Sequence, residues 1–234
     1  MTDFLQAIGY DRWALHVLIV LPLVGIVPVL LAPAAAARRI ALVVTLVEFV
    51  LSAGLWWAFD PAAGMQLASS TPWIGRLGIS YAVAVDGISL FMVLLSTALM
   101  PLAVLSSFTY ITRHERAYYA LLLAQLVGMI GCFIATDLFL FYVFFELLLI
   151  PMYFLIGIWG GANRLYAAIK FFVYTIFGSL LMLVAILVMV WKVANATGTL
   201  SFAYEHLLGN AGAVGSAAPW LFAAFALAFA IKVP

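Results

Sequence analysis

The chain has 234 residues, of which 68% are hydrophobic and 8% are charged, and its formal net charge is +1. Soluble globular domains carry about 25% charged residues, so this composition excludes them and leaves a polytopic membrane protein. The near-zero charge provides no basic patch for nucleic acid, and the single Cys132 excludes a disulfide framework and a cysteine-based metal site.

Seven apolar runs predict seven transmembrane helices, because helix is the only open-chain structure that satisfies its own backbone in lipid. They cover residues 15–31, 40–58, 85–109, 117–136, 138–158, 165–193 and 219–234. The sixth run is long enough to project beyond the bilayer or to tilt. The first residues carry mixed charges and no small-residue cleavage site, so we expect the first run to be retained.

Two longer connections are expected outside the membrane. Residues 61–84 contain Trp73, Tyr81 and scattered glycines, which suit a segment lying at the membrane interface. Residues 195–218 are rich in Gly, Ala and Ser and predict an outer loop that could hold a short strand or hairpin.

Arginines gather in the loops after the first, third and fifth predicted spans, which share one side of the membrane if the spans alternate. These residues are Arg38, Arg39, Arg113, Arg116 and Arg164, whereas the other side holds Arg12, Arg76 and Lys192, diluted by six acidic residues. The positive-inside rule then places the N-terminus outside and the arginine loops in the cytoplasm.

Glu146 lies near the middle of the fifth predicted span, LFLFYVFFELLLIPMYFLIGI, which is otherwise uncharged. An ionisable group there costs at least ~2.5–3 kcal/mol, so such residues usually pair or carry function. Two interpretations stay open: a protonated carboxyl that packs by hydrogen bonding, or a carboxylate that exchanges protons beside a cation. Pro151 cannot donate to the Leu147 carbonyl, and a helix break or kink there would help water to enter.

Two lysines within predicted spans, Lys232 and Lys170, are candidates for function. Lys232 is ~13 residues into the last run, or ~20 Å deep at helical rise, and Pro234 predicts a helix break beside it. A lysine beside such a break is common in transporters, and snorkelling to the interface is the alternative. Lys170 lies about one and a half turns into the sixth span. Snorkelling is the simpler interpretation there, whereas an inward position would put Lys170 between the cytoplasm and Glu146.

Three acidic residues complete the set. Glu48 lies midway along the second span, where contact with a partner subunit, tolerance on the lipid side and function stay open. Asp86 and Asp137 open the third and fifth spans, and both suit structural helix caps. We find no phosphate-binding glycine loop, no nucleophile with a base, and no metal, haem or iron–sulfur ligand set. Any redox chemistry is therefore expected in other subunits.

A family resemblance rests on three stretches: FFELLLIPMYFLIGIWGGANRLYAAIKFFVYTIFGSLLML, VDGISLFMVLL and the terminal AFAIKVP. They resemble subunit M of the respiratory NADH:quinone oxidoreductase (complex I), the bacterial counterpart of mitochondrial NADH dehydrogenase subunit 4. The resemblance is strong over residues 81–185 and the terminal segment, and weak over the first 60. The Mrp-type antiporter superfamily is similar but more distant.

The resemblance implies an all-α, antiporter-like membrane helix bundle. Residues 1–110 would form three N-terminal helices with an outer loop at 60–84, and residues 111–234 would form helices four to seven of the first inverted repeat. It implies proton translocation through Glu146, Lys170 and Lys232, and gives no role to Glu48. The family's chain is much longer, so we expect a truncated product or fragment that stops before the second inverted repeat.

The function that the resemblance implies is proton translocation driven by electron transfer elsewhere in a complex. This chain would hold no cofactor, and NADH, FMN, iron–sulfur clusters and quinone are expected in partner subunits. Its partners would be the lipid bilayer and other membrane-arm subunits, including antiporter-like neighbours, in a bacterial inner membrane. An Mrp-type cation/proton antiporter subunit and a structural membrane-arm scaffold are the alternatives.

Overall fold

The computed structural model describes residues 2–233 and contains seven helical segments long and apolar enough to cross a membrane. The candidate spans are Tyr10–Leu31, Ala34–Ala58, Gly87–Ser106, Glu115–Ile134, Leu138–Trp159, Arg164–Thr197 and Ala211–Lys232. The prediction of a polytopic bundle with seven spans is therefore confirmed. The observed ends differ from the predicted ones, by up to several residues.

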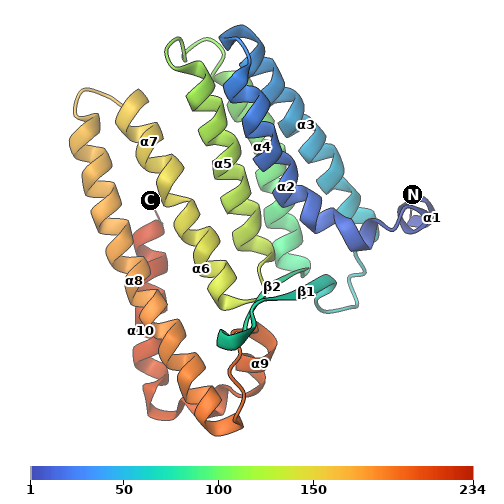
Figure 1. Ribbon diagram of the computed structural model, residues 1–234, viewed down its shortest axis with the longest axis vertical. Helices are drawn as coiled ribbons and strands as arrows, with labels where there is room; N and C mark the ends of the chain where they lie inside the picture. The colour runs from blue at the N-terminus through green and yellow to red at the C-terminus, as the bar shows by residue number, and fades with distance from the viewer. Residues whose placement is uncertain (1, 234) are drawn as a thin grey trace.

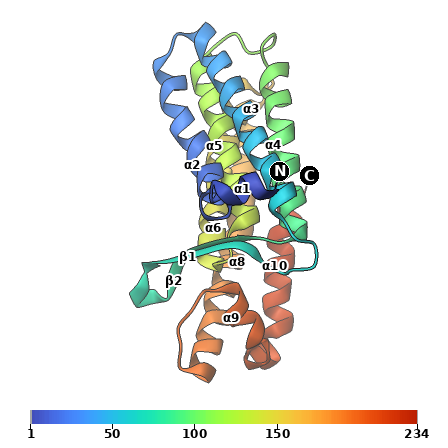
Figure 2. The ribbon, with the colours of Figure 1, turned by 90° about the vertical axis from the view of Figure 1, so that its right-hand side faces the viewer.

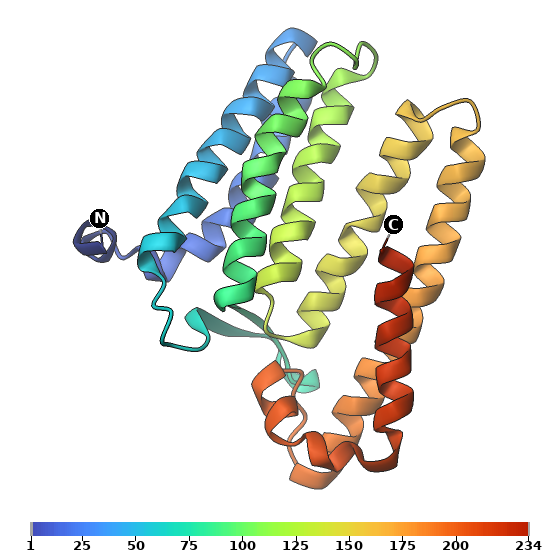
Figure 3. The same ribbon diagram turned by 180° about the vertical axis from the view of Figure 1, so that it is seen from behind.

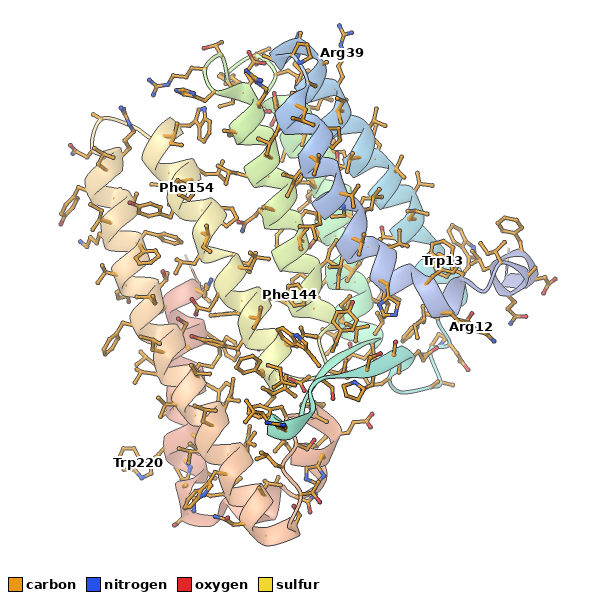
Figure 4. All side chains as sticks on the ribbon, viewed as in Figure 1. Arg12, Trp13, Arg39, Phe144, Phe154 and Trp220 are labelled. Carbon is orange, nitrogen blue, oxygen red and sulfur yellow. The ribbon has the colours of Figure 1, made fainter. Side chains whose placement is uncertain are left out.

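Four helices form the first part of the bundle: α2 (Tyr10–Leu31), α3 (Ala34–Ala58), α4 (Gly87–Ser106) and α5 (Glu115–Ile134) (Figure 1). The short α1 (Thr2–Ala7) precedes them. α5 is the most buried span, and small residues allow its neighbours to approach closely. A Cβ at Gly131 would overlap the Phe144 ring, and one at Gly25 of α2 would meet Val44 of α3 at 2.9 Å. Figure 4 marks Phe144 in the middle of the molecule.

The second part consists of α6 (Leu138–Leu147), α7 (Leu149–Trp159), α8 (Arg164–Thr197) and α10 (Ala218–Lys232) (Figure 3). At 1.5 Å per residue the 34 residues of α8 extend ~51 Å, well beyond the ~30 Å hydrocarbon core. α10 packs on α8 where Gly178 leaves room, since a Cβ there would lie 2.7 Å from Ile231. Trp220, on the outside of this part, is 79% exposed and points away from the bundle.

The segment predicted to lie at the membrane interface forms a β-hairpin. Antiparallel strands β1 (Gln66–Ile74) and β2 (Ile79–Val85) flank the 3-10 turn η1 (Gly75–Leu77) and cross the end of the helix bundle (Figure 2). β1 is largely exposed and does not alternate regularly, whereas β2 is mostly buried. The hairpin therefore depends on tertiary contacts, and the interface prediction gave no strand.

Most of residues 195–218 are helical, and residues 198–203 have irregular backbone. This segment contains α9 (Tyr204–Gly209) and the 3-10 segment η2 (Ala211–Ala217). Within residues 195–218, strand pairing is limited to the isolated bridge between Asp137 and Ala203. The expected strand or hairpin is wrong here, because the Gly- and Ala-rich sequence winds into 3-10 turns between α9 and α10.

The three arginine-containing loops lie at one end of the bundle, and the hairpin and α9 lie at the other (Figure 1). Arg39 marks the first end and Arg12 lies towards the second (Figure 4). Arg113 donates to the Ile158 carbonyl at 3.0 Å, and the Trp159 indole donates to the Arg113 carbonyl at 2.9 Å. These bonds tie the α4–α5 loop to the end of α7. The division predicted at residue 110 falls within this loop and stays a prediction.

Candidate functional site

Asp137 fixes the start of α6. Its Oδ1 accepts from the backbone amides of Phe139 (2.9 Å) and Leu140 (3.1 Å), and its Oδ2 accepts from the Ser80 amide of β2 at 2.9 Å. The side chain is 1% exposed. One carboxylate thus caps the helix and joins it to the hairpin, which sets the direction of α6 towards Glu146, about two and a half turns further on.

The fifth span is interrupted at Leu148, between α6 and α7. This residue keeps helical dihedrals (φ −63°, ψ −28°), and its N–H reaches the Phe144 carbonyl at 3.3 Å. Pro151, buried in α7, has no N–H to offer to the Leu147 carbonyl. The missing donor of Pro151 falls five residues after Glu146 and leaves the Leu147 carbonyl without its helical hydrogen bond.

Glu146 is partly buried, and its Oε1 atom is fully enclosed with no hydrogen-bond partner. Tyr142, one turn earlier on α6, lies near both Glu146 and Ser179 of α8. Ser179 is 3% exposed. The carboxyl therefore lies at a polar spot between α6 and α8, surrounded by otherwise apolar helices.

Lys232 approaches the same place from α10. Its Nζ donates to the Phe145 carbonyl at 3.3 Å and lies 4.2 Å from the centroid of the Phe145 ring. Glu146 and Cys132 are both within electrostatic reach of the ammonium. The structure thus brings Lys232 to the residue directly before Glu146, where its ammonium contacts Phe145 rather than the Glu146 carboxylate. Pro234, predicted to break this helix, lies outside the described residues.

Lys170 is exposed on α8, and its Nζ lies 5.7 Å from the ring of Tyr166 on the same helix. Its ammonium therefore contacts a residue of its own helix, and the structure does not bring Lys170 together with Glu146 and Lys232.

Asp86 occupies the N-cap of α4. Its Oδ1 accepts from the Ser89 amide at 2.7 Å, and the Ser89 hydroxyl accepts from the Asp86 amide at 2.8 Å. This reciprocal capping box, above all the bond from the Ser89 backbone, holds the pKa of the Asp86 carboxyl below its ordinary value.

Glu48 is 0% exposed, so the lipid-side interpretation is wrong. The signal that could have located it is a helical stripe: every third or fourth residue of α3 faces the other helices. The buried members are Ala37, Ala41, Thr45, Glu48, Ser52 and Leu55.

Comparison with known proteins places this arrangement in a family. A family profile described as "NADH:quinone oxidoreductase/Mrp antiporter, TM" matches residues 135–234. NADH-quinone oxidoreductase subunit M of Rhodobacter capsulatus is 45% identical over 206 residues, which are 85% of this chain and 40% of that protein. The chain belongs to this family of membrane subunits. Subunit M of Escherichia coli K12 is 42% identical over 209 residues, or 84% and 41% of the two chains.

Solved structures of related complexes have the same fold as this chain. A chain from respiratory complex I of Thermus thermophilus with bound NADH matches with a TM-score of 0.81 and 31% identity, over 94% of this chain and 44% of that one. A chain of the Mrp complex from Dietzia sp. DQ12-45-1b matches with a TM-score of 0.74 at 22% identity, which shows a shared fold. The predicted antiporter-like, multi-pass membrane fold is confirmed. The chain spans about 40% of the length of the curated relatives that it matches.

Proposed function

We propose that this chain is part of a proton-translocating membrane subunit of an NADH:quinone oxidoreductase. One observation supports the proposal most directly. Glu146, whose Oε1 is enclosed without a hydrogen-bond partner, directly follows Phe145, and the Phe145 carbonyl accepts from the Lys232 ammonium. An acid and a base at this depth are costly in a membrane unless they are used. The similarity to subunit M supports the same function.

The two groups can relay a proton because each stabilises the charge of the other. When the Lys232 ammonium is close to the Glu146 carboxylate, both charged forms are favoured. When the groups separate, each charge loses its partner in a low-dielectric environment and the neutral forms become favoured. Lys232 then releases a proton and becomes an amine, and Glu146 takes up a proton and becomes a carboxylic acid.

Phe145 has a part in this relay. Its carbonyl and ring face contact the Lys232 ammonium and stabilise it without the Glu146 carboxylate. They offer the lysine a second position, and movement between the two positions would change the charge on both groups. Lys170, on the half of α8 near the arginine loops, would supply protons from that side.

The proposal assigns the redox chemistry to partner subunits, so NADH, FMN, iron–sulfur clusters and quinone would be bound outside this chain. The partners would be other membrane-arm subunits, including antiporter-like neighbours, and electron transfer would act on the Glu146 site as a long-range coupling. The connections from α2 to α3, α4 to α5 and α7 to α8 share one end of the bundle, and the arginines in and beside them support a cytoplasmic position for that end in a bacterial inner membrane. The N-terminus would then lie outside.

An Mrp-type cation/proton antiporter subunit is the second candidate, because the family description names both classes and the Mrp structure shares the fold. A purely structural membrane-arm subunit is a third. Sodium separates the first two: a pH gradient linked to NADH oxidation and insensitive to sodium favours the oxidoreductase, whereas sodium-dependent proton flux without NADH favours the antiporter.

The test uses the full-length subunit in membrane vesicles. Lys232→Ala should abolish the NADH-driven pH gradient while the complex still assembles, because the relay loses its base. Glu146→Asp should retain part of the gradient, since the carboxyl remains but is one methylene shorter. A full gradient in Lys232→Ala would refute the relay and favour the structural role.

A further inference from the structure

Glu48 is a second acid within the membrane, on the helices that the relay does not use. It is 0% exposed on α3, and both carboxyl oxygens are enclosed without a hydrogen-bond partner. Glu146, by comparison, is only partly buried. Unpaired buried polar groups are rare in native proteins, so the burial of this carboxyl without a partner indicates a specific protonation state or role.

No cation contacts Glu48 among the described residues. Helices α1, α2, α4 and α5 pack against α3, and α4 has no titratable side chain. The cationic groups on these helices bond elsewhere or lie near the helix ends: His16 of α2 is hydrogen-bonded to Tyr81, Arg116 of α5 donates to the Leu30 carbonyl, and Arg12 lies in the first turn of α2. From α2, Tyr10 is within electrostatic reach of Glu48. On α5, Tyr119 instead interacts with Ser107, Glu115 and Arg38. Arg38 lies ten residues before Glu48 on α3, or ~15 Å along the helix.

An ionised carboxylate in such a place costs several kcal/mol, and nothing among the described neighbours offsets it. A neutral carboxylic acid avoids most of this cost. The nearby helix faces also carry hydroxyls: Ser52, one turn after Glu48, bonds to Thr97 of α4 at 2.6 Å.

A route leads from this acid to the surface. The Tyr10 hydroxyl donates to the carbonyl of Leu51, which is three residues after Glu48 on α3. Tyr10 also lines a cavity of about 370 Å³ between α1, the start of α2 and the end of α3, whose other lining residues include Asp11, Trp57 and Asp60. This cavity lies at the end of the bundle opposite the arginine loops (Figure 1).

We propose that Glu48 is a proton-binding site, neutral at physiological pH, which exchanges its proton with the cavity through the Tyr10 hydroxyl. At rest the Tyr10 hydroxyl donates to Leu51 and the Glu48 carboxyl has no partner, so each exchange begins when side-chain rotation brings the two groups together. The carboxyl then gives a proton to the phenol oxygen while the phenol passes its own proton to water in the cavity, and the reverse transfer restores the acid. The site is separate from the pair of Glu146 and Lys232, and it holds one proton that exchanges with the side opposite the arginine loops.

The experiment is infrared spectroscopy of the full-length protein in membranes at rest, without NADH. A protonated carboxyl without a hydrogen-bond partner gives a C=O band at the high-frequency end of the carboxyl region. That band should be lost in Glu48→Gln and in Glu48→Leu, two replacements of similar volume that need no charge partner, and it should persist in Glu146→Gln. An unchanged spectrum in both Glu48 variants would overturn the proposal, because Glu48 would then be ionised.

The route is tested by transfer into D₂O. Tyr10→Phe keeps the ring but removes the relay, so the deuterium shift of the Glu48 band should slow by at least about tenfold. Tyr119→Phe is the matched control, because it removes another buried phenol on a different helix, and its exchange should equal wild type. Wild-type exchange in Tyr10→Phe would overturn the route. Since none of these measurements uses electron transfer, their outcome is independent of the relay at Glu146.

Discussion

Replacing Asp137 with alanine should destabilise the protein by about 3 kcal/mol. Loss of the N-cap of α6, which holds the amides of Phe139 and Leu140, costs about 1 kcal/mol. Loss of the charge-assisted bond to the Ser80 amide, in a place where Asp137 itself is 1% exposed, costs about 1.5–3 kcal/mol more. The effect should be large because one carboxylate serves two elements.

The free energy of unfolding of the full-length protein can be measured by denaturant titration in mixed micelles. Asp86→Ala is the matched control, because Asp86 caps α4 by similar bonds but joins no second element, and it should cost about 1 kcal/mol. The hairpin should also become more accessible to protease in Asp137→Ala alone. If Asp137→Ala cost no more than Asp86→Ala, the bond to Ser80 would contribute nothing and the reasoning would fail.

Two further predictions concern packing and pH. Gly131→Ala should destabilise the protein by about 1–3 kcal/mol, because the new methyl group overlaps the Phe144 ring, whereas Gly161→Ala, with nothing within 4 Å, should be nearly neutral by thermal unfolding. The bond from the Ser89 amide lowers the pKa of the Asp86 carboxyl in the folded protein. The stability that Asp86 contributes should therefore be complete above about pH 4, and it should be lost as the pH falls through the lowered pKa. When the free energy of unfolding is measured as the pH is lowered, Asp86→Asn should lack this loss. A pH profile of Asp86→Asn identical to that of wild type would contradict the assignment.

The membrane spans could be predicted because the signal is local. Long apolar runs must be helical in lipid whatever they pack against, so composition alone located seven spans. The ends of the helices were predicted less accurately than their positions. α8 runs to Thr197, beyond the predicted end at residue 193, and α2 begins at Tyr10, before the predicted start at residue 15.

The hairpin and the inward face of Glu48 depend on tertiary structure. β2 gains its burial from the helix ends and from Asp137, which is far away in sequence, so the pattern of residues 61–84 alone did not reveal a strand. Glu48 could have been assigned from the spacing of Ala41, Thr45 and Ser52 on one face of α3. The contact of Lys232 with Phe145 could not be predicted, because it depends on how α10 lies against α6.

The most direct test of the account is NADH-driven proton uptake or release by membrane vesicles containing the full-length subunit, comparing wild type with Glu146→Gln. Glu205→Gln, an exposed acid of α9, is the matched control. The account predicts that Glu146→Gln loses the pH gradient while the complex still assembles, and that Glu205→Gln keeps it. A wild-type gradient in Glu146→Gln would contradict the account, because the buried carboxyl would then be a packing residue and protons would cross elsewhere.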